Sequence, residues 1–152
     1  MPSRIDAPSG DVPIEVYATI SVPNRVESIR PTAQFIIAAA QRMDVPAASD
    51  SMFEVAIAEA LNNAVRHGNT AKLPDAEILC TLRRVGRQLT LSICDQGPGF
   101  ELPGPAPEWS PENVAMLPEG GFGLPIIQQV FPVVRTIRRR PGEFGLEMAL
   151  TF

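Results

Sequence analysis

The chain has 152 residues, 45% of them hydrophobic and 20% charged, which is typical of one globular domain. No apolar run approaches the roughly 18 residues of a membrane span, and the first residues lack the apolar core of a secretory signal, so we expect a cytoplasmic protein that does not bind membranes. A net charge of −4 argues against direct nucleic-acid binding, because phosphate contacts favour a cationic excess.

The first half of the chain predicts an arm, a strand and two helices. Residues 1–13 hold three prolines and a glycine without periodicity, which indicates a flexible arm ahead of a single domain over residues 14–152. Residues 14–21 alternate apolar and polar side chains, as a strand does. Residues 28–43 and 51–68 have the spacing of amphipathic helices, with apolar side chains on one face of each.

The ends of these helices carry capping signals. Ser28 is a candidate cap for the first helix. Ser51 and Glu54 stand in capping-box register at the start of the second, and Gly68 is a C-terminal stop.

The second half predicts two hairpins around one more helix. Residues 76–85 and 88–95 read as paired strands, residues 120–131 as a glycine-rich loop opening a helix, and residues 133–140 and 143–152 as a closing hairpin. This order predicts an α/β fold, a two-layer sandwich with a mixed, mostly antiparallel sheet and helices on one face.

Two segments of this half stand out. Residues 96–120 contain six of the 16 prolines, only residues 111–117 within them could form a short helix, and such long connections are more often functional than decorative. Asp95 shares the parity of Leu89 and Leu91, so its carboxylate should emerge on the face that packs against the helices. A carboxylate there is costly without a partner, which indicates a site.

Two other features have plain explanations. Cys80 and Cys94 fit no metal or redox spacing, so we expect buried free thiols, as in a reducing compartment. The basic residues at 135–140 form either a solvated strand face or a patch that meets a partner.

Three stretches require a common explanation. Glu59 and Asn63 stand four residues apart on the polar edge of the second helix, "DQGPGF" follows the strand at 95–100, and "GGFGL" opens the last helix at 120–124. Alone, the first fits a solvated helix face, the second a plain turn and the third an anion-binding helix start. Their order and separation carry the inference.

Together the stretches resemble the ATP-binding domain shared by histidine kinases, type II topoisomerases, the Hsp90 chaperone and mismatch-repair ATPases, called the GHKL or Bergerat fold. "EALNNAVRHGN" at 59–69 is similar to its N-box, "DQGPGF" to its Asp-x-Gly-x-Gly box and "GGFGL" to its last glycine box. Within that group the chain looks most like the small anti-sigma-factor serine/threonine kinases of partner-switching systems.

The resemblance implies that the chain binds ATP and Mg²⁺. Asp95 would bind the adenine amino group, and Gly97 and Gly99 would let the backbone approach the base. The phosphates would be received by residues of the last box: Gly121, Phe122, Gly123 and Leu124.

The resemblance also implies different roles for the residues on the polar edge of the second helix. Asn63 would bind Mg²⁺ through its amide oxygen, which suits a hard cation, and Glu59 would be the catalytic base that takes the proton of the attacking hydroxyl. His67 we interpret as structural, because it closes the helix.

The implied function is phosphorylation of a small STAS-type anti-anti-sigma protein, with sequestration of a sigma factor and a possible homodimer through the sheet. A histidine kinase needs a phosphoacceptor histidine, whereas the only histidine lies in the N-box. No Lys or Arg stands between Arg87 and Arg135, although phosphoryl transfer usually places a cation near the developing charge. Arg30 or Arg66 could supply this cation instead.

The alternative function is a regulatory switch that binds ATP and its partners without phosphoryl transfer.

Overall fold

The computed structural model describes residues 15–68, 74–99, 102, 123–139 and 142–152. The predicted arm over 1–13 and the predicted short helix over 111–117 lie outside these residues. The helices and strands follow the predicted order, with two short 3₁₀ turns at Val26–Ser28 and Pro46–Ser49 beside α1 and α2. They are β1 (Glu15–Pro23), α1 (Ile29–Arg42), α2 (Ser51–Gly68), β2 (Glu77–Val85), β3 (Gln88–Asp95), α4 (Gly123–Val130), β4 (Val133–Ile137) and β5 (Phe144–Thr151).

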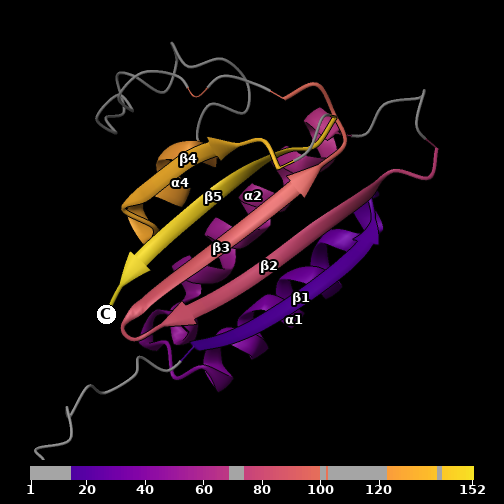
Figure 1. Ribbon diagram of the computed structural model, residues 1–152. Coiled ribbons are helices and arrows are strands. Elements are labelled where there is room, and N and C mark those ends of the chain that lie inside the picture. The colour runs from indigo at the N-terminus through magenta and orange to yellow at the C-terminus, as the bar shows by residue number, and fades with distance from the viewer. Residues whose placement is uncertain (1–14, 69–73, 100–101, 103–122, 140–141) are drawn as a thin grey trace, which may run out of the picture.

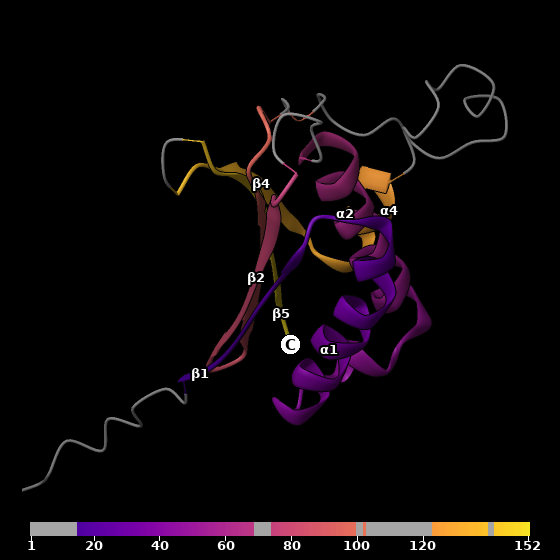
Figure 2. The ribbon, with the colours of Figure 1, turned by 90° about the vertical axis from the view of Figure 1, so that its right-hand side faces the viewer.

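The strands form one sheet in the order β1-β2-β3-β5-β4 (Figure 1). Every pairing among them is antiparallel, so the described strands include none of the parallel pairs that a mixed sheet would contain. Figure 2 shows α1, α2 and α4 together on one side of the sheet. The predicted two-layer α/β sandwich is therefore confirmed.

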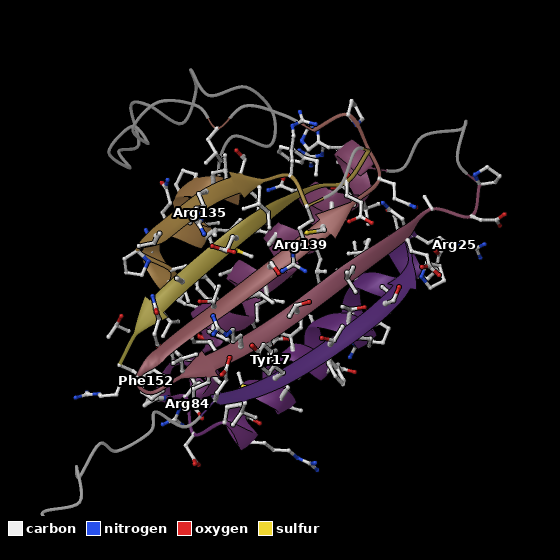
Figure 3. All side chains as sticks on the ribbon, viewed as in Figure 1. Tyr17, Arg25, Arg84, Arg135, Arg139 and Phe152 are labelled. Carbon is white, nitrogen blue, oxygen red and sulfur yellow. The ribbon has the colours of Figure 1, made fainter. Side chains whose placement is uncertain are left out.

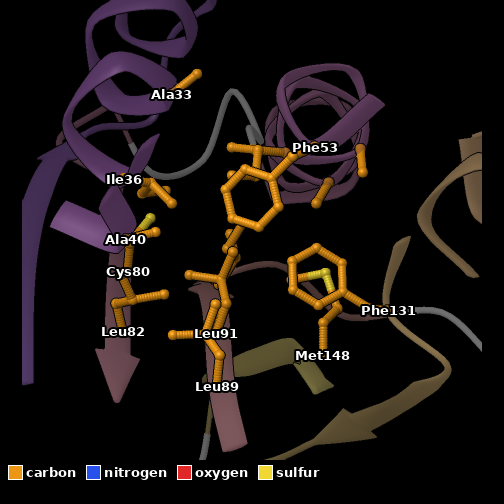
Figure 4. Packing of buried hydrophobic residues seen from close by; sticks show 14 of the residues in the cluster. Ala33, Ile36, Ala40, Phe53, Cys80, Leu82, Leu89, Leu91, Phe131 and Met148 are labelled. Carbon is orange, nitrogen blue, oxygen red and sulfur yellow. The ribbon is translucent and has the colours of Figure 1, made fainter. Parts of the chain in front are cut away.

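The core lies between the sheet and the helices, because every second side chain of the inner strands points that way. Phe53 of α2 and Phe131, just after α4, meet there with ring centroids 5.7 Å apart (Figure 4). Leu89 and Leu91 of β3 are fully buried against them. Asp95 continues their parity to the end of β3 and, as predicted, is buried on the same face.

The helix starts differ from the sequence prediction in their caps. Asp50, not Ser51, caps α2, because the backbone N–H of Met52 donates to Asp50 Oδ1 at 2.8 Å. At α1, Ser28 is in the cap position but its side chain makes no capping bond; instead Thr32 Oγ1 donates to the Ser28 carbonyl at 2.6 Å. At the start of α2, Asp50 and Ser51 are adjacent and both are residue types that cap helices, so the sequence alone does not choose between them.

The strand β4 is shorter than predicted, because it ends at Ile137 rather than at residue 140. The next two arginines leave the ladder and bind elsewhere: Arg138 donates to the Pro98 carbonyl and Arg139 to Ser92 Oγ. Arg135 forms an ion pair with Glu147. The described part of this basic cluster is therefore engaged within the chain.

The cysteines are free and buried, as predicted. Cys80 faces the core, where burial raises the pKa of its thiol to about 12. Cys80 pairs with Ile93 and Cys94 with Leu79, so the two thiols point to opposite faces of the sheet. Among the described residues, no helix has the length and apolar content that crossing a membrane requires.

Phe53→Ala is expected to lower the free energy of unfolding by about 3–5 kcal/mol, because it leaves a cavity against Phe131. Urea denaturation followed by circular dichroism measures this change. Phe35→Ala on α1 is the matched control, since Phe35 is 38% exposed whereas Phe53 is fully buried. Equal losses for the two variants would contradict this packing.

Candidate functional site

The polar edge of α2 faces the start of α4. Glu59 and Asn63 are both partly buried, one helical turn apart. A β-carbon placed on Gly123, the first residue of α4, would lie 3.0 Å from Glu59 Oε2 and 3.8 Å from Asn63 Nδ2. The carboxylate and the amide thus border a helix N-terminus whose first amides have no partner within the helix. They are not a plain solvated face.

A second group lies where α2 ends against the end of β3. Asp95 is only 4% exposed, and a β-carbon on Gly68 would lie 2.5 Å from Asp95 Cβ. The Gly97 N–H donates to Asp95 Oδ1 at 2.8 Å. Burial raises the pKa of Asp95 to about 6, against a smaller lowering by the Gly97 hydrogen bond. The protein therefore holds a carboxylate in a place that disfavours its charge.

The two glycines after Asp95 each have a packing reason. A β-carbon on Gly97 would lie 2.3 Å from the His67 carbonyl oxygen. Gly99 has φ of +84°, and a β-carbon there would lie 2.4 Å from the Phe144 ring. Only glycine fits at both positions. The turn between them consequently lies tightly between the end of α2 and the start of β5.

The helix α2 connects the two groups. A helix rises about 1.5 Å per residue, so Gly68 lies about 14 Å along the axis from Glu59, with Asn63 between them. A buried carboxylate marks one end of this line, and the start of α4 marks the other. The arrangement suits an elongated ligand with a hydrogen-bond donor at one end and anionic groups at the other.

Of the other residues predicted for the site, some lie outside the described part of the chain and some lie within it. Gly121 and Phe122 lie outside the described residues. The Leu124 side chain packs partly buried against the core, so only its backbone is left for a ligand. His67 occupies the last turn of α2, and burial, with a smaller contribution from Arg66, lowers its pKa. This position fits the predicted structural role.

The donor set near Gly123 suits Mg²⁺. Carboxylate and amide oxygens are ligands for a hard cation that takes its other oxygens from water and phosphate. In the part of the chain that the structure describes, no group of three or more His, Cys, Asp or Glu side chains could hold a metal ion. The side chains near Gly123 therefore suit a cation that is also bound by the phosphates of a ligand.

Sequence reasoning missed two residues beside this site, Phe144 and Arg138. Phe144 pairs with Asp95 across β3 and β5, and its ring supports Gly99. The Arg138 guanidinium lies 5.6 Å from the centroid of that ring. The only signal that could have found them is the strand order, because β5 neighbours β3 although α4 and β4 separate them in sequence.

The comparison with protein families defines the class of protein. The family described as "Histidine kinase-like ATPase domain" matches residues 22–150. The chain therefore belongs to the histidine kinase-like ATPase family, the GHKL group whose motifs its sequence resembles. No curated protein matches the chain.

Among solved structures, the chain is similar to the crystal structure of the RsbU and RsbW domains of Rv1364c from Mycobacterium tuberculosis. The TM-score is 0.62, and the match has 14% identity and covers 90% of this chain. This chain spans 32% of the length of that one. At this identity the likeness is one of fold.

Asp95→Asn is expected to stabilise the fold at neutral pH. The pKa of Asp95 rises from 3.8 to about 6 on folding, so above pH 6 the folded state carries a charge that burial disfavours by roughly 3 kcal/mol. The amide removes this charge and keeps an oxygen for the Gly97 N–H. We expect a higher midpoint of thermal unfolding at pH 7.5.

The pH dependence of this gain follows from the direction of the pKa change. Well below pH 3.8 the wild-type carboxyl is protonated in both states, so the advantage of Asp95→Asn should vanish there, grow between about pH 4 and pH 6, and level off above pH 6. Asp75→Asn, at an exposed aspartate ahead of β2, is the control. A gain that does not vary with pH, or a loss at pH 7.5, would contradict the burial of this charge.

Proposed function

We propose that the chain is an ATP- and Mg²⁺-dependent serine/threonine protein kinase and anti-sigma factor that phosphorylates a small STAS-type protein in the cytoplasm. The observation that carries the proposal is the edge of α2, where Glu59 and Asn63 meet the first residue of α4 and the helix end meets Asp95. Membership of the histidine kinase-like ATPase family supports ATP as the bound nucleotide.

Asp95 is the proposed adenine-binding residue. A buried carboxylate accepts a hydrogen bond from an amino group, and Gly97 already occupies one of its oxygens. Binding an adenine amino group would supply a second donor and offset the cost of burying the charge. Gly97 and Gly99 bring the backbone close to the same place.

The other end of the α2 edge is the proposed phosphate and metal end. Gly121 to Leu124 would bind phosphate oxygens through backbone amides at the start of α4. Asn63 would orient Mg²⁺ through its amide oxygen, and Glu59 would accept the proton of the partner's hydroxyl as the phosphoryl group leaves. ATP supplies the phosphoryl group, and Mg²⁺ offsets the negative charge of its phosphates.

Partner switching is the proposed context. The solved structure with this fold contains a domain named RsbW, and the proposal extends that likeness to this chain. The partners would be a STAS-type anti-anti-sigma protein and a sigma factor. None of the described helices covers the other face of the sheet (Figure 2), and this face is the proposed surface for a homodimer.

A second candidate is a switch that binds ATP and its partners without transferring phosphate. The absence of Lys and Arg between Arg87 and Arg135 favours it, because a cation usually stabilises the transferred phosphoryl group. Arg66 is exposed near the end of α2, and Arg138 contacts the Pro98 carbonyl. Neither is placed at Gly123, where the phosphates are proposed to bind.

Asp95→Ala is expected to abolish ATP binding, because it removes the buried carboxylate that is proposed to accept the adenine amino group. Isothermal titration calorimetry measures the affinity, and far-ultraviolet circular dichroism confirms that the variant folds. Asp75→Ala is the control for loss of an aspartate near β2. Unchanged ATP affinity in the folded Asp95→Ala variant would refute the assignment of the adenine end.

Glu59→Ala is expected to reduce phosphoryl transfer about 100-fold or more, the usual contribution of a general base, while ATP still binds. The assay follows label from γ-labelled ATP onto the STAS-type protein encoded nearest to this chain. Glu54→Ala is the matched control, since Glu54 is an exposed glutamate on the same helix. Tight ATP-dependent binding of the partner without any label, in the wild type, would establish the switch instead.

A further inference from the structure

The hairpin that closes the sheet touches the turn after Asp95. Arg138, just beyond β4, donates from Nη2 to the Pro98 carbonyl at 3.5 Å. Its guanidinium also lies over the Phe144 ring, 5.6 Å from the centroid. Phe144 in turn lies against Gly99. One arginine therefore contacts the turn directly and also supports the ring beneath it.

Other contacts hold the near side of the turn. Gln96, the residue just before the Gly97–Gly99 turn, accepts a hydrogen bond from the Glu77 N–H through its side-chain Oε1 at 2.9 Å. This bond attaches the start of the turn to β2. Gly97 is bound to Asp95 itself. On the far side of the turn, the Pro98 carbonyl accepts a hydrogen bond from Arg138, and Gly99 lies against the Phe144 ring. Loss of Arg138 would remove the hydrogen bond to the Pro98 carbonyl and the cation over the Phe144 ring.

The neighbouring arginine does something different. Arg139 donates from Nη2 to Ser92 Oγ at 2.8 Å. Ser92 alternates with Leu91 and Ile93 along β3, so it lies on the face of the sheet away from the helices, and Figure 3 shows Arg139 over that face. Of two adjacent arginines of equal charge, Arg138 thus contacts the turn, whereas Arg139 binds a strand residue on the face away from the helices.

We propose that Arg138 is a positioning residue for the base-binding end of the site, holding the Gly97–Gly99 turn against Phe144 so that the Asp95 carboxylate keeps one orientation. Arg138 acts through the turn and not by touching the ligand. A fixed carboxylate distinguishes an amino group from a carbonyl at the same position on a base, because it accepts a hydrogen bond from the first and repels the second. Arg138 therefore sets the preference for adenine over guanine nucleotides. This inference rests on the proposed function.

The experiment compares Arg138→Ala with Arg139→Ala, which removes the same charge one residue away. Titrations with ATP and GTP give the ratio of the two dissociation constants for each variant. Arg138→Ala is expected to weaken ATP binding about fivefold, as loss of one exposed cation–π contact and one weak hydrogen bond would, with little change for GTP. Arg139→Ala should keep the wild-type ratio. Arg138→Lys, which keeps the charge but not the planar group, should fall between.

A second readout needs no nucleotide. Hydrogen exchange of the Gly97 amide, measured by NMR on the free protein, reports whether its bond to Asp95 opens more often. Arg138→Ala should speed this exchange about fivefold, matching the loss of ATP affinity, and Arg139→Ala should leave it unchanged.

The outcomes separate this inference from the proposed function. If Arg138→Ala weakens ATP and GTP equally, the residue serves the phosphates, and the inference fails. If the Gly97 amide exchanges at the wild-type rate in Arg138→Ala, or equally fast in Arg139→Ala, the inference also fails. A wild-type protein that binds no ATP would refute the proposed function and with it the role in nucleotide preference. In that case the Gly97 amide still decides whether Arg138 holds the turn.

Discussion

The contact between the end of α2 and the end of β3 is the constraint on which the site depends. Gly68 lies so close to Asp95 that a β-carbon would come within 2.5 Å of its side chain, and a β-carbon on Gly97 would lie 2.3 Å from the His67 carbonyl oxygen. This contact buries the Asp95 carboxylate and fixes the turn that follows it. Because α2 is one rigid helix, the same contact also sets where Glu59 and Asn63 lie relative to that carboxylate.

The site conflicts with the stability of the fold at one residue. The hydrophobic face of α2 packs into the core, where its side chains are favourable to bury, whereas the same packing places Asp95 in surroundings that raise its pKa to about 6. A fold selected for stability alone would have a neutral residue there. A buried carboxylate with one backbone donor is instead what a site for an amino-bearing ligand requires, and such conflicts are common at functional sites.

The sequence predicted where Asp95, Glu59 and Asn63 lie in the fold, but it did not predict the residues that pack around Asp95. Periodicity in β3 placed Asp95 on the helix face, and helical spacing placed Glu59 beside Asn63, since both patterns are local. Sequence could not show that Phe144 pairs with Asp95, because that depends on β5 inserting between β3 and β4. It also could not show that Arg138 leaves the strand to reach the turn, because that contact is tertiary. From the sequence pattern alone, β4 would continue through Arg138 to residue 140, whereas it ends at Ile137.

The most direct test of the central claim is a crystal structure of the protein with Mg²⁺ and a non-hydrolysable ATP analogue. The predicted result is an adenine amino group within hydrogen-bonding distance of the Asp95 carboxylate. The same structure should have phosphates at the start of α4 and Mg²⁺ bound by Asn63, with Glu59 facing the terminal phosphate. A nucleotide bound away from the α2 edge, or with its base at Gly123 and its phosphates at Asp95, would contradict the claim.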